Sequence, residues 1–223
     1  DAADESIDSL IDLVRELNVP QYLSVAYSCR ARLSLLRCDL ATAIEWTHSI
    51  NETPVPSALF MWLEIPSITQ ARVLIADGTE ASLVKAIELL DTLAQLAQTC
   101  RFTNQTIEIA VLQPMALVKL ERGNEALAAL KEVVALAGPL GWIRPFIEAG
   151  APMADLLKQL RKRDASVDYI NRILAAFPDT ESKPPLTDLR ATNDEREFEA
   201  ETVTPIQNPK SKIQNSLIEP LTN

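Results

Sequence analysis

The sequence predicts an all-α chain in which two-helix repeats stack side by side into a solenoid. Three related segments support this, because each contains an alanine-led stretch of a first helix (Ala31–Leu36, Ala71–Ala76 and Ala116–Leu120), and these stretches recur every 40 and 45 residues. Apolar residues follow the three- and four-residue spacing of a helix, and no segment alternates as a half-buried strand does. A helix pair cannot bury its apolar stripe alone, so neighbouring pairs must pack together.

The helices follow from these patterns in order along the chain. We expect helices at 6–17, 21–37, 40–49, 57–76, 80–100, 104–122, 124–137, 152–162 and 166–176, with a short helical turn at 143–149. Within the helix at 80–100, Leu83, Ile87 and Leu90 share one face. Small residues such as Ala86 and Ala126 fall where paired helices must approach closely. We therefore assign residues 1–177 to one helical repeat domain.

Glycine and proline mark particular points in these helices. Gly78 and Gly123 are expected to supply the left-handed residue that ends a first helix. Pro66 and Pro114 fall inside predicted first helices, where each should remove a backbone hydrogen bond and bend the helix. Two interpretations of such a bend stay open: superhelical curvature, or a carbonyl that faces a ligand.

The character of the sequence changes after Phe177. Residues 178–223 are rich in Pro, Thr, Asn and Glu, hold six of the prolines and carry few large apolar side chains. This composition predicts a disordered linker, with a transient helix near 193–201.

Composition excludes several kinds of partner. The net charge of −10 argues against binding to nucleic acid or to an anionic membrane, since both require a basic surface. No run of eighteen apolar residues is present to span a bilayer. Cys29, Cys38 and Cys100 are an odd set without metal-ligand spacing, which indicates reduced thiols in a cytoplasmic protein.

No catalytic motif is present in the sequence. The single histidine, His48, lies near the end of a predicted helix with no nucleophile in a recognisable setting, so a surface position is expected. The acidic clusters at 1–12 and 194–201 lack metal-ligand spacing and are interpreted as solvated charge. We therefore expect neither enzymatic activity nor a bound cofactor or metal.

The region from Gly123 to Leu160 contains the most specific motif. Its landmarks are Gly123, Ala126-Leu127, Leu130, Ala135-Leu136-Ala137, Gly141-Trp142, Arg144-Pro145-Phe146, Glu148-Ala149-Gly150, Met153 and Leu156-Leu157. This block resembles the C-terminal part of the tetratricopeptide-like region of large ATP-dependent LuxR-type transcription regulators, the MalT-like family. The resemblance extends more weakly back to about Tyr22. In addition, residues 217–223 resemble the lead-in to a LuxR-type helix-turn-helix, with Thr222 as a helix N-cap.

The resemblance implies a function. In this family a helical superhelix between an ATPase module and a DNA reader senses an inducer and mediates self-association. The chain has no phosphate-binding loop and no basic recognition helix, so we expect a regulatory segment that binds neither ATP nor DNA itself. Expected partners are a small-molecule inducer, other domains of the same regulator and a second copy. A free-standing tetratricopeptide adaptor that binds partner peptides is the alternative.

Candidate binding residues lie on the first helices, which line the concave face of tetratricopeptide arrays. An aromatic ring with amides and charges there suits a polar solute such as a sugar, although an ordinary solvated position explains each residue better when it is taken singly. Arg144 and Glu148 are one helical turn apart, and two interpretations remain: they contact a ligand, or they form a local ion pair. The candidates are Arg30, Trp62, Gln70, Arg72, Glu108, Gln113, Arg144 and Glu148.

Overall fold

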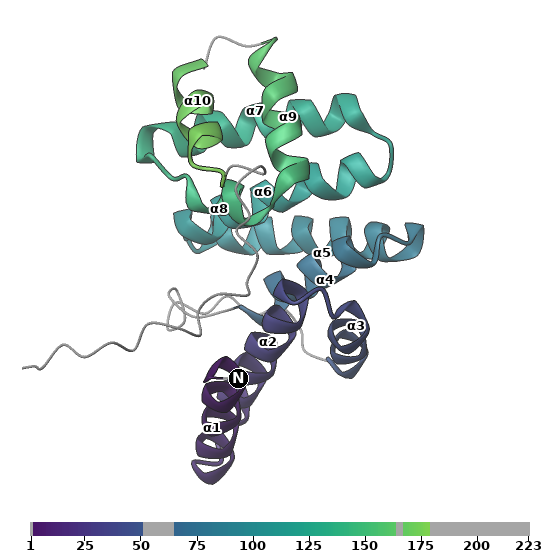
Figure 1. Cartoon of the computed structure of the whole chain (residues 1–223), viewed down its shortest axis with the longest axis vertical. Coiled ribbons are helices and arrows are strands. Elements are labelled where there is room, and N and C mark those ends of the chain that lie inside the picture. Colours follow the sequence, from purple (N-terminus) through teal and green to yellow (C-terminus); the bar gives the residue numbers. More distant parts are fainter. Residues whose placement is uncertain (1, 51–64, 164–166, 179–223) are drawn as a thin grey trace, which may run out of the picture. The chain divides into compact units, whose positions relative to one another are not determined.

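The computed structural model describes residues 2–50, 65–163 and 167–178, and this part of the chain contains helices but no strand (Figure 1). The chain divides by contacts into residues 1–180 and 181–223, and the description concerns the first unit. The helices are α1 (Ala2–Glu16), α2 (Pro20–Leu36), α3 (Leu40–Ser49), α4 (Pro66–Asp77), α5 (Glu80–Thr99), α6 (Thr103–Lys119), α7 (Gly123–Ala137), the 3-10 turn η2 (Gly138–Leu140), α8 (Arg144–Glu148), α9 (Ala151–Arg161) and α10 (Val167–Ala175). The predicted all-α class is confirmed, and the predicted linker lies outside the described residues.

The helices stack as two-helix repeats. α2 packs against α3, α4 against α5 and α6 against α7, while α2, α4, α6 and α8 contact one another in sequence as a row of first helices. The alanines that mark the repeats, Ala31, Ala71 and Ala116, are buried in this row. Their missing side-chain bulk allows the close approach that the repeat pattern predicted.

One apolar core runs from α4 to α10. Its fully buried side chains include Leu90, Leu130, Phe146 and Leu157. Among the described residues, no buried side chain of α1, α2 or α3 belongs to this cluster. Those three helices bury mainly small residues, such as Ala26 and Ala43, and a few branched ones.

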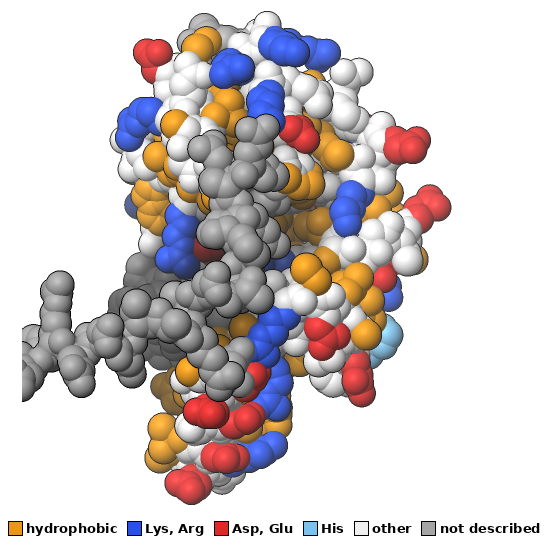
Figure 2. All heavy atoms as spheres, viewed as in Figure 1, with side chains coloured by type: hydrophobic (Ala, Val, Ile, Leu, Met, Phe, Trp, Pro, Cys, Tyr) orange, Lys and Arg blue, Asp and Glu red, His pale blue; other side chains and the backbone are white. Residues whose placement is uncertain are grey.

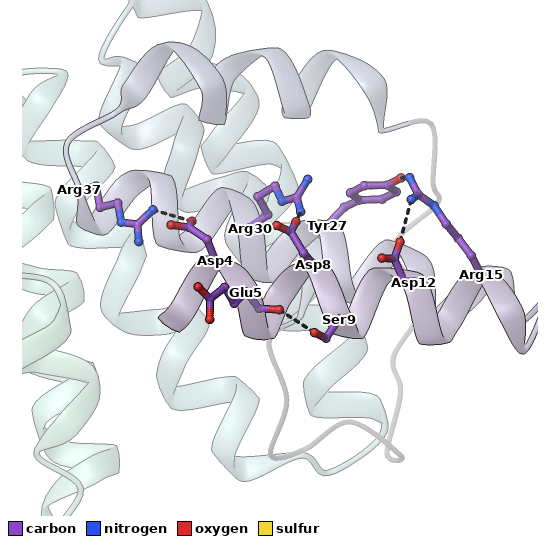
Figure 3. A network of polar contacts seen from close by, with 9 residues as sticks. All are labelled: Asp4, Glu5, Asp8, Ser9, Asp12, Arg15, Tyr27, Arg30 and Arg37. Atoms are coloured by element: carbon purple, nitrogen blue, oxygen red, sulfur yellow. Dashed lines mark hydrogen bonds and ion pairs between the residues drawn. The ribbon is translucent and has the colours of Figure 1, made fainter. Parts of the chain in front are cut away.

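Ion pairs join α1 to α2 where apolar burial is limited. Asp4 lies 2.6 Å from Arg37, Asp8 pairs with Arg30, and Arg15 binds both Asp12 and the Tyr27 hydroxyl (Figure 3). Acidic side chains gather over α1 beside basic ones on the same face (Figure 2). The interpretation of residues 1–12 as merely solvated charge was therefore incomplete, because three of these carboxylates pair with arginines.

Four of the turns between the described helices share one geometry. Cys38, Arg101, Glu121 and Gly141 adopt left-handed backbone angles, with φ of 62°, 57°, 60° and 67°. In each case the next residue donates its N–H to a carbonyl five residues back, as from Arg122 to Leu117 at 2.9 Å. This is the Schellman arrangement that satisfies helix C-terminal carbonyls.

Two sequence expectations about these turns and helix starts were wrong. Gly123 does not end α6; it begins α7, and Glu121 takes the left-handed position instead. Pro66 does not bend a longer helix, because α4 starts at that residue, where a missing N–H costs nothing. Gly78 does end α4 with φ of 71°, and Pro114 lies inside α6 as expected.

Candidate functional site

The row of first helices carries a cluster of charged side chains, which we name the charged cluster: Arg32 on α2, Arg72 on α4, Glu108 on α6, and Arg144 and Glu148 on α8. Each member comes from a helix that the repeat packing places beside the next one. The cluster therefore joins residues that are distant in sequence.

Arg72 is the buried member of the cluster. Its side chain is only 6% exposed, and its Nη2 atom lies 2.5 Å from the Glu108 Oε1 atom. The Arg72 Nε atom is buried and has no hydrogen-bond partner. A buried donor without a partner destabilises the folded protein. The Arg72 guanidinium can therefore donate one further hydrogen bond, from its Nε atom.

Glu148 connects three arginines from three helices. Its Oε1 atom accepts a hydrogen bond from Arg144 Nε at 2.6 Å, one turn earlier on α8. Its Oε2 atom lies 3.5 Å from Arg32 Nη2 and 3.8 Å from Arg72 Nη2. The two longer contacts are ion pairs rather than hydrogen bonds, since they reach or exceed the usual limit for one.

The local sequence explains why α8 presents Glu148 at this point. Gly141 ends the preceding 3-10 turn with φ of 67°, and Gly150 follows α8 with φ of 78°. Between them Phe146 is fully buried and meets the Tyr169 ring edge-on at a centroid distance of 6.4 Å. Tyr169 also donates its hydroxyl to the Trp142 carbonyl, and burial raises the pKa of that hydroxyl. Contacts at Phe146 within α8 and at Trp142 before it therefore hold the short helix against Tyr169.

The remaining candidates do not join the charged cluster. Arg30 pairs with Asp8 of α1, and Gln113 donates to Asp91 of α5 at 2.8 Å. Gln70 lies two positions before Arg72, or about 200° around the helix, and lines a groove on the opposite face of α4. Trp62 lies outside the described residues.

Arg32 belongs to the cluster but was missed by sequence reasoning. Ala31-Arg32 and Ala71-Arg72 occupy the same place in two repeats, and that repetition was the available signal. Both arginines follow the buried alanine of a first helix, so both emerge from the same face of the row.

His48 is exposed near the end of α3, as expected, and among the described residues no group of histidine, cysteine and acidic side chains could hold a metal ion. None of the described helices is long and apolar enough to cross a membrane.

A stack of helical hairpins with a charged cluster on its first-helix row defines a helical-repeat scaffold, a class that is typically non-catalytic. The comparison with protein families is specific: residues 1–163 match the family model described as the MalT-like TPR region. The chain therefore belongs to the MalT-like tetratricopeptide family. No curated protein and no solved structure matches the chain.

Proposed function

We propose that this chain is the sensor and interaction segment of a LuxR-type transcription regulator, and that the charged cluster is its recognition site. Membership in the MalT-like family supports a regulatory role. The buried and incompletely bonded Arg72 supports the location, because a ligand acceptor would satisfy a donor that the protein leaves without a partner.

The observation that carries the proposal is the position of Glu148. This one carboxylate contacts arginines of α2 and α4 as well as its own helix, so it links the first repeat to the last short helix of the row. A ligand that competes for these arginines would alter how the repeats are held together. A ligand shifts a conformational equilibrium when it binds one conformation of the protein more tightly than the other.

The test is a transcription reporter driven by the complete regulator, whose reading frame also shows whether a helix-turn-helix is encoded. Glu148→Gln and Arg72→Lys should each change induced or basal transcription severalfold, since Lys cannot reproduce the planar donor fork of Arg. The matched control is Arg122→Lys, because Arg122 makes only an exposed local pair with Glu125. Unchanged transcription in both cluster variants, with normal helical circular dichroism, would refute the assignment.

Self-association is a separate part of the proposal. Leu10 and Leu13 of α1 and Leu17, which directly follows this helix, recur at helical spacing and are 38%, 52% and 59% exposed. A row of exposed leucines is a surface that a second protein chain can cover. Sedimentation velocity should show a dimer that Leu13→Lys abolishes; a wild-type chain that stays monomeric at high concentration would contradict it.

A further inference from the structure

A groove lies on the face of α4 opposite the charged cluster. It is a groove of about 400 Å³ between α3, α4 and the start of α5. This volume falls near the lower end of the range for small-molecule sites, so the groove suits a ligand of few atoms rather than an extended chain. Its lining residues are Ile44, Thr47, His48, Gln70, Val73, Leu74, Asp77, Ser82, Lys85 and Leu89.

The groove has an apolar part contributed by three helices. Ile44 of α3, Leu74 of α4 and Leu89 of α5 are half-buried and face the same space. Because they keep part of their surface exposed, an apolar group that entered the groove would remove that surface from water.

Three polar side chains of the groove have no partner in the part of the chain that the structure describes. Within the described residues, His48, Gln70 and Lys85 make no hydrogen bond or ion pair through their side chains. Gln70 is half-buried at this site, whereas Lys85 and His48 are exposed. These groups therefore retain their full capacity to bind a solute.

Two opposite charges line the groove without meeting each other. Asp77 accepts a hydrogen bond from the Thr79 hydroxyl at 2.7 Å, and contacts with Ser82 and Thr79 lower the pKa of its carboxyl, so it is ionised at neutral pH. Lys85 lies one turn beyond Ser82 on α5, and no described residue forms an ion pair with it. One carboxylate, which Ser82 and Thr79 contact and Lys119 also influences, and one ammonium group without an ion-pair partner among the described residues thus border the same small space.

We infer that this groove binds a small zwitterion with an apolar side chain, of the class of the neutral apolar α-amino acids. The ligand carboxylate would contact Lys85, its ammonium group would contact Asp77, and its side chain would lie against Leu74, Leu89 and Ile44. The Gln70 amide would complete the polar contacts. This site goes beyond the proposed function, because it uses none of the residues of the charged cluster.

The experiment is isothermal titration of the full 223-residue chain with L-leucine, N-acetyl-L-leucine and L-leucinamide. We expect saturable binding of L-leucine, and at least about tenfold weaker binding of each blocked analogue, since each lacks one of the two charges. Lys85→Gln should weaken L-leucine binding by a similar factor, whereas Lys162→Gln, a matched change of another exposed lysine beyond α9, should leave it unchanged.

Several outcomes would overturn the inference. These are no heat of binding with millimolar L-leucine, equal binding of the blocked analogues, and equal binding to the Lys85→Gln variant. Arg72→Lys should not affect this titration. Failure of the charged cluster in the reporter and failure of the groove in the titration are therefore separate results.

Discussion

The Arg32 Nη2 atom of α2 lies 3.5 Å from the Glu148 Oε2 atom of α8. In a solenoid each repeat normally contacts only its neighbours, so a pair that joins the first repeat to the last short helix of the row is unusual. Arg32 and Glu148 side chains are 18% and 29% exposed, which makes this contact less screened than a fully solvated pair. The pair provides a link across the first-helix row that apolar stacking alone would not provide.

Loss of the Glu148 carboxylate should therefore reduce stability more than loss of an ordinary surface carboxylate. We expect Glu148→Gln to lower the free energy of unfolding by about 1–2 kcal/mol, because it weakens contacts to Arg32, Arg72 and Arg144 together. Urea denaturation followed by circular dichroism measures this change. The control, Glu125→Gln, breaks one exposed pair that solvent screens, and it should cost clearly less than Glu148→Gln. Equal losses in the two variants would contradict the central role of Glu148.

Gly150 has a backbone conformation that other residues avoid. Its φ of 78° and ψ of −167° lie in a region that is nearly restricted to glycine. We expect Gly150→Ala to destabilise the chain by about 1–3 kcal/mol. Gly123→Ala is the control, since Gly123 is at a helix start where an added Cβ atom would meet nothing within 4 Å. That variant should be neutral or slightly stabilising, and thermal unfolding of both variants distinguishes them.

Lys119 of α6 caps the end of α4. Its Nζ atom donates to the Ile75 carbonyl at 2.5 Å and to the Ala76 carbonyl at 3.2 Å. A cation at a helix C-terminus is favourable, so Lys119→Met should cost about 1 kcal/mol in urea denaturation. Lys162→Met, which changes an exposed lysine beyond α9, should cost less. An unchanged midpoint for Lys119→Met would show that the cap contributes nothing.

The ion pairs between α1 and α2 should weaken in acid. The hydrogen bond from Arg37 lowers the pKa of Asp4 from 3.8 to about 2. A carboxyl with a depressed folded-state pKa contributes stability above its unfolded value, and that contribution is lost as pH falls from about 4 through about 2. A carbon-detected NMR titration of the Asp4 carboxyl should give a midpoint near 2, moving toward 3.8 in Arg37→Gln. A midpoint that does not move would exclude Arg37 as the cause.

The helices could be predicted from the sequence because their determinants are local. Apolar spacing, the buried alanines and Gly78 all act within a few residues, and the predicted ranges agree with the described helices within a few residues except where α4 begins at Pro66. Gly123 misled the prediction because glycine is favoured at a left-handed position, yet Glu121 adopts that position two residues earlier. The hydrogen bonds that close the end of α6 fix which residue takes the left-handed angle, and they outweigh the conformational preference of glycine.

The candidate site was harder to predict because it depends on which face each helix turns inward. Arg72, Glu108, Arg144 and Glu148 were selected as polar residues of the helical repeats, and the structure brings them together. Gln70 is on the other side of the same helix as Arg72, since two residues of separation rotate the side chain to the opposite face. The contact between Arg32 and Glu148 could be found only after the repeats were packed.

The division of the apolar core has a consequence for partial unfolding. Because the described buried residues of α1–α3 lie outside the cluster that spans α4–α10, the two segments should exchange amide hydrogens at different rates. We expect α1–α3 to become labelled while α4–α10 remain protected, and added salt to widen that gap. The groove is lined by residues of both segments. An occupant should therefore slow deuterium uptake most in α3, the least protected of the helices that line it.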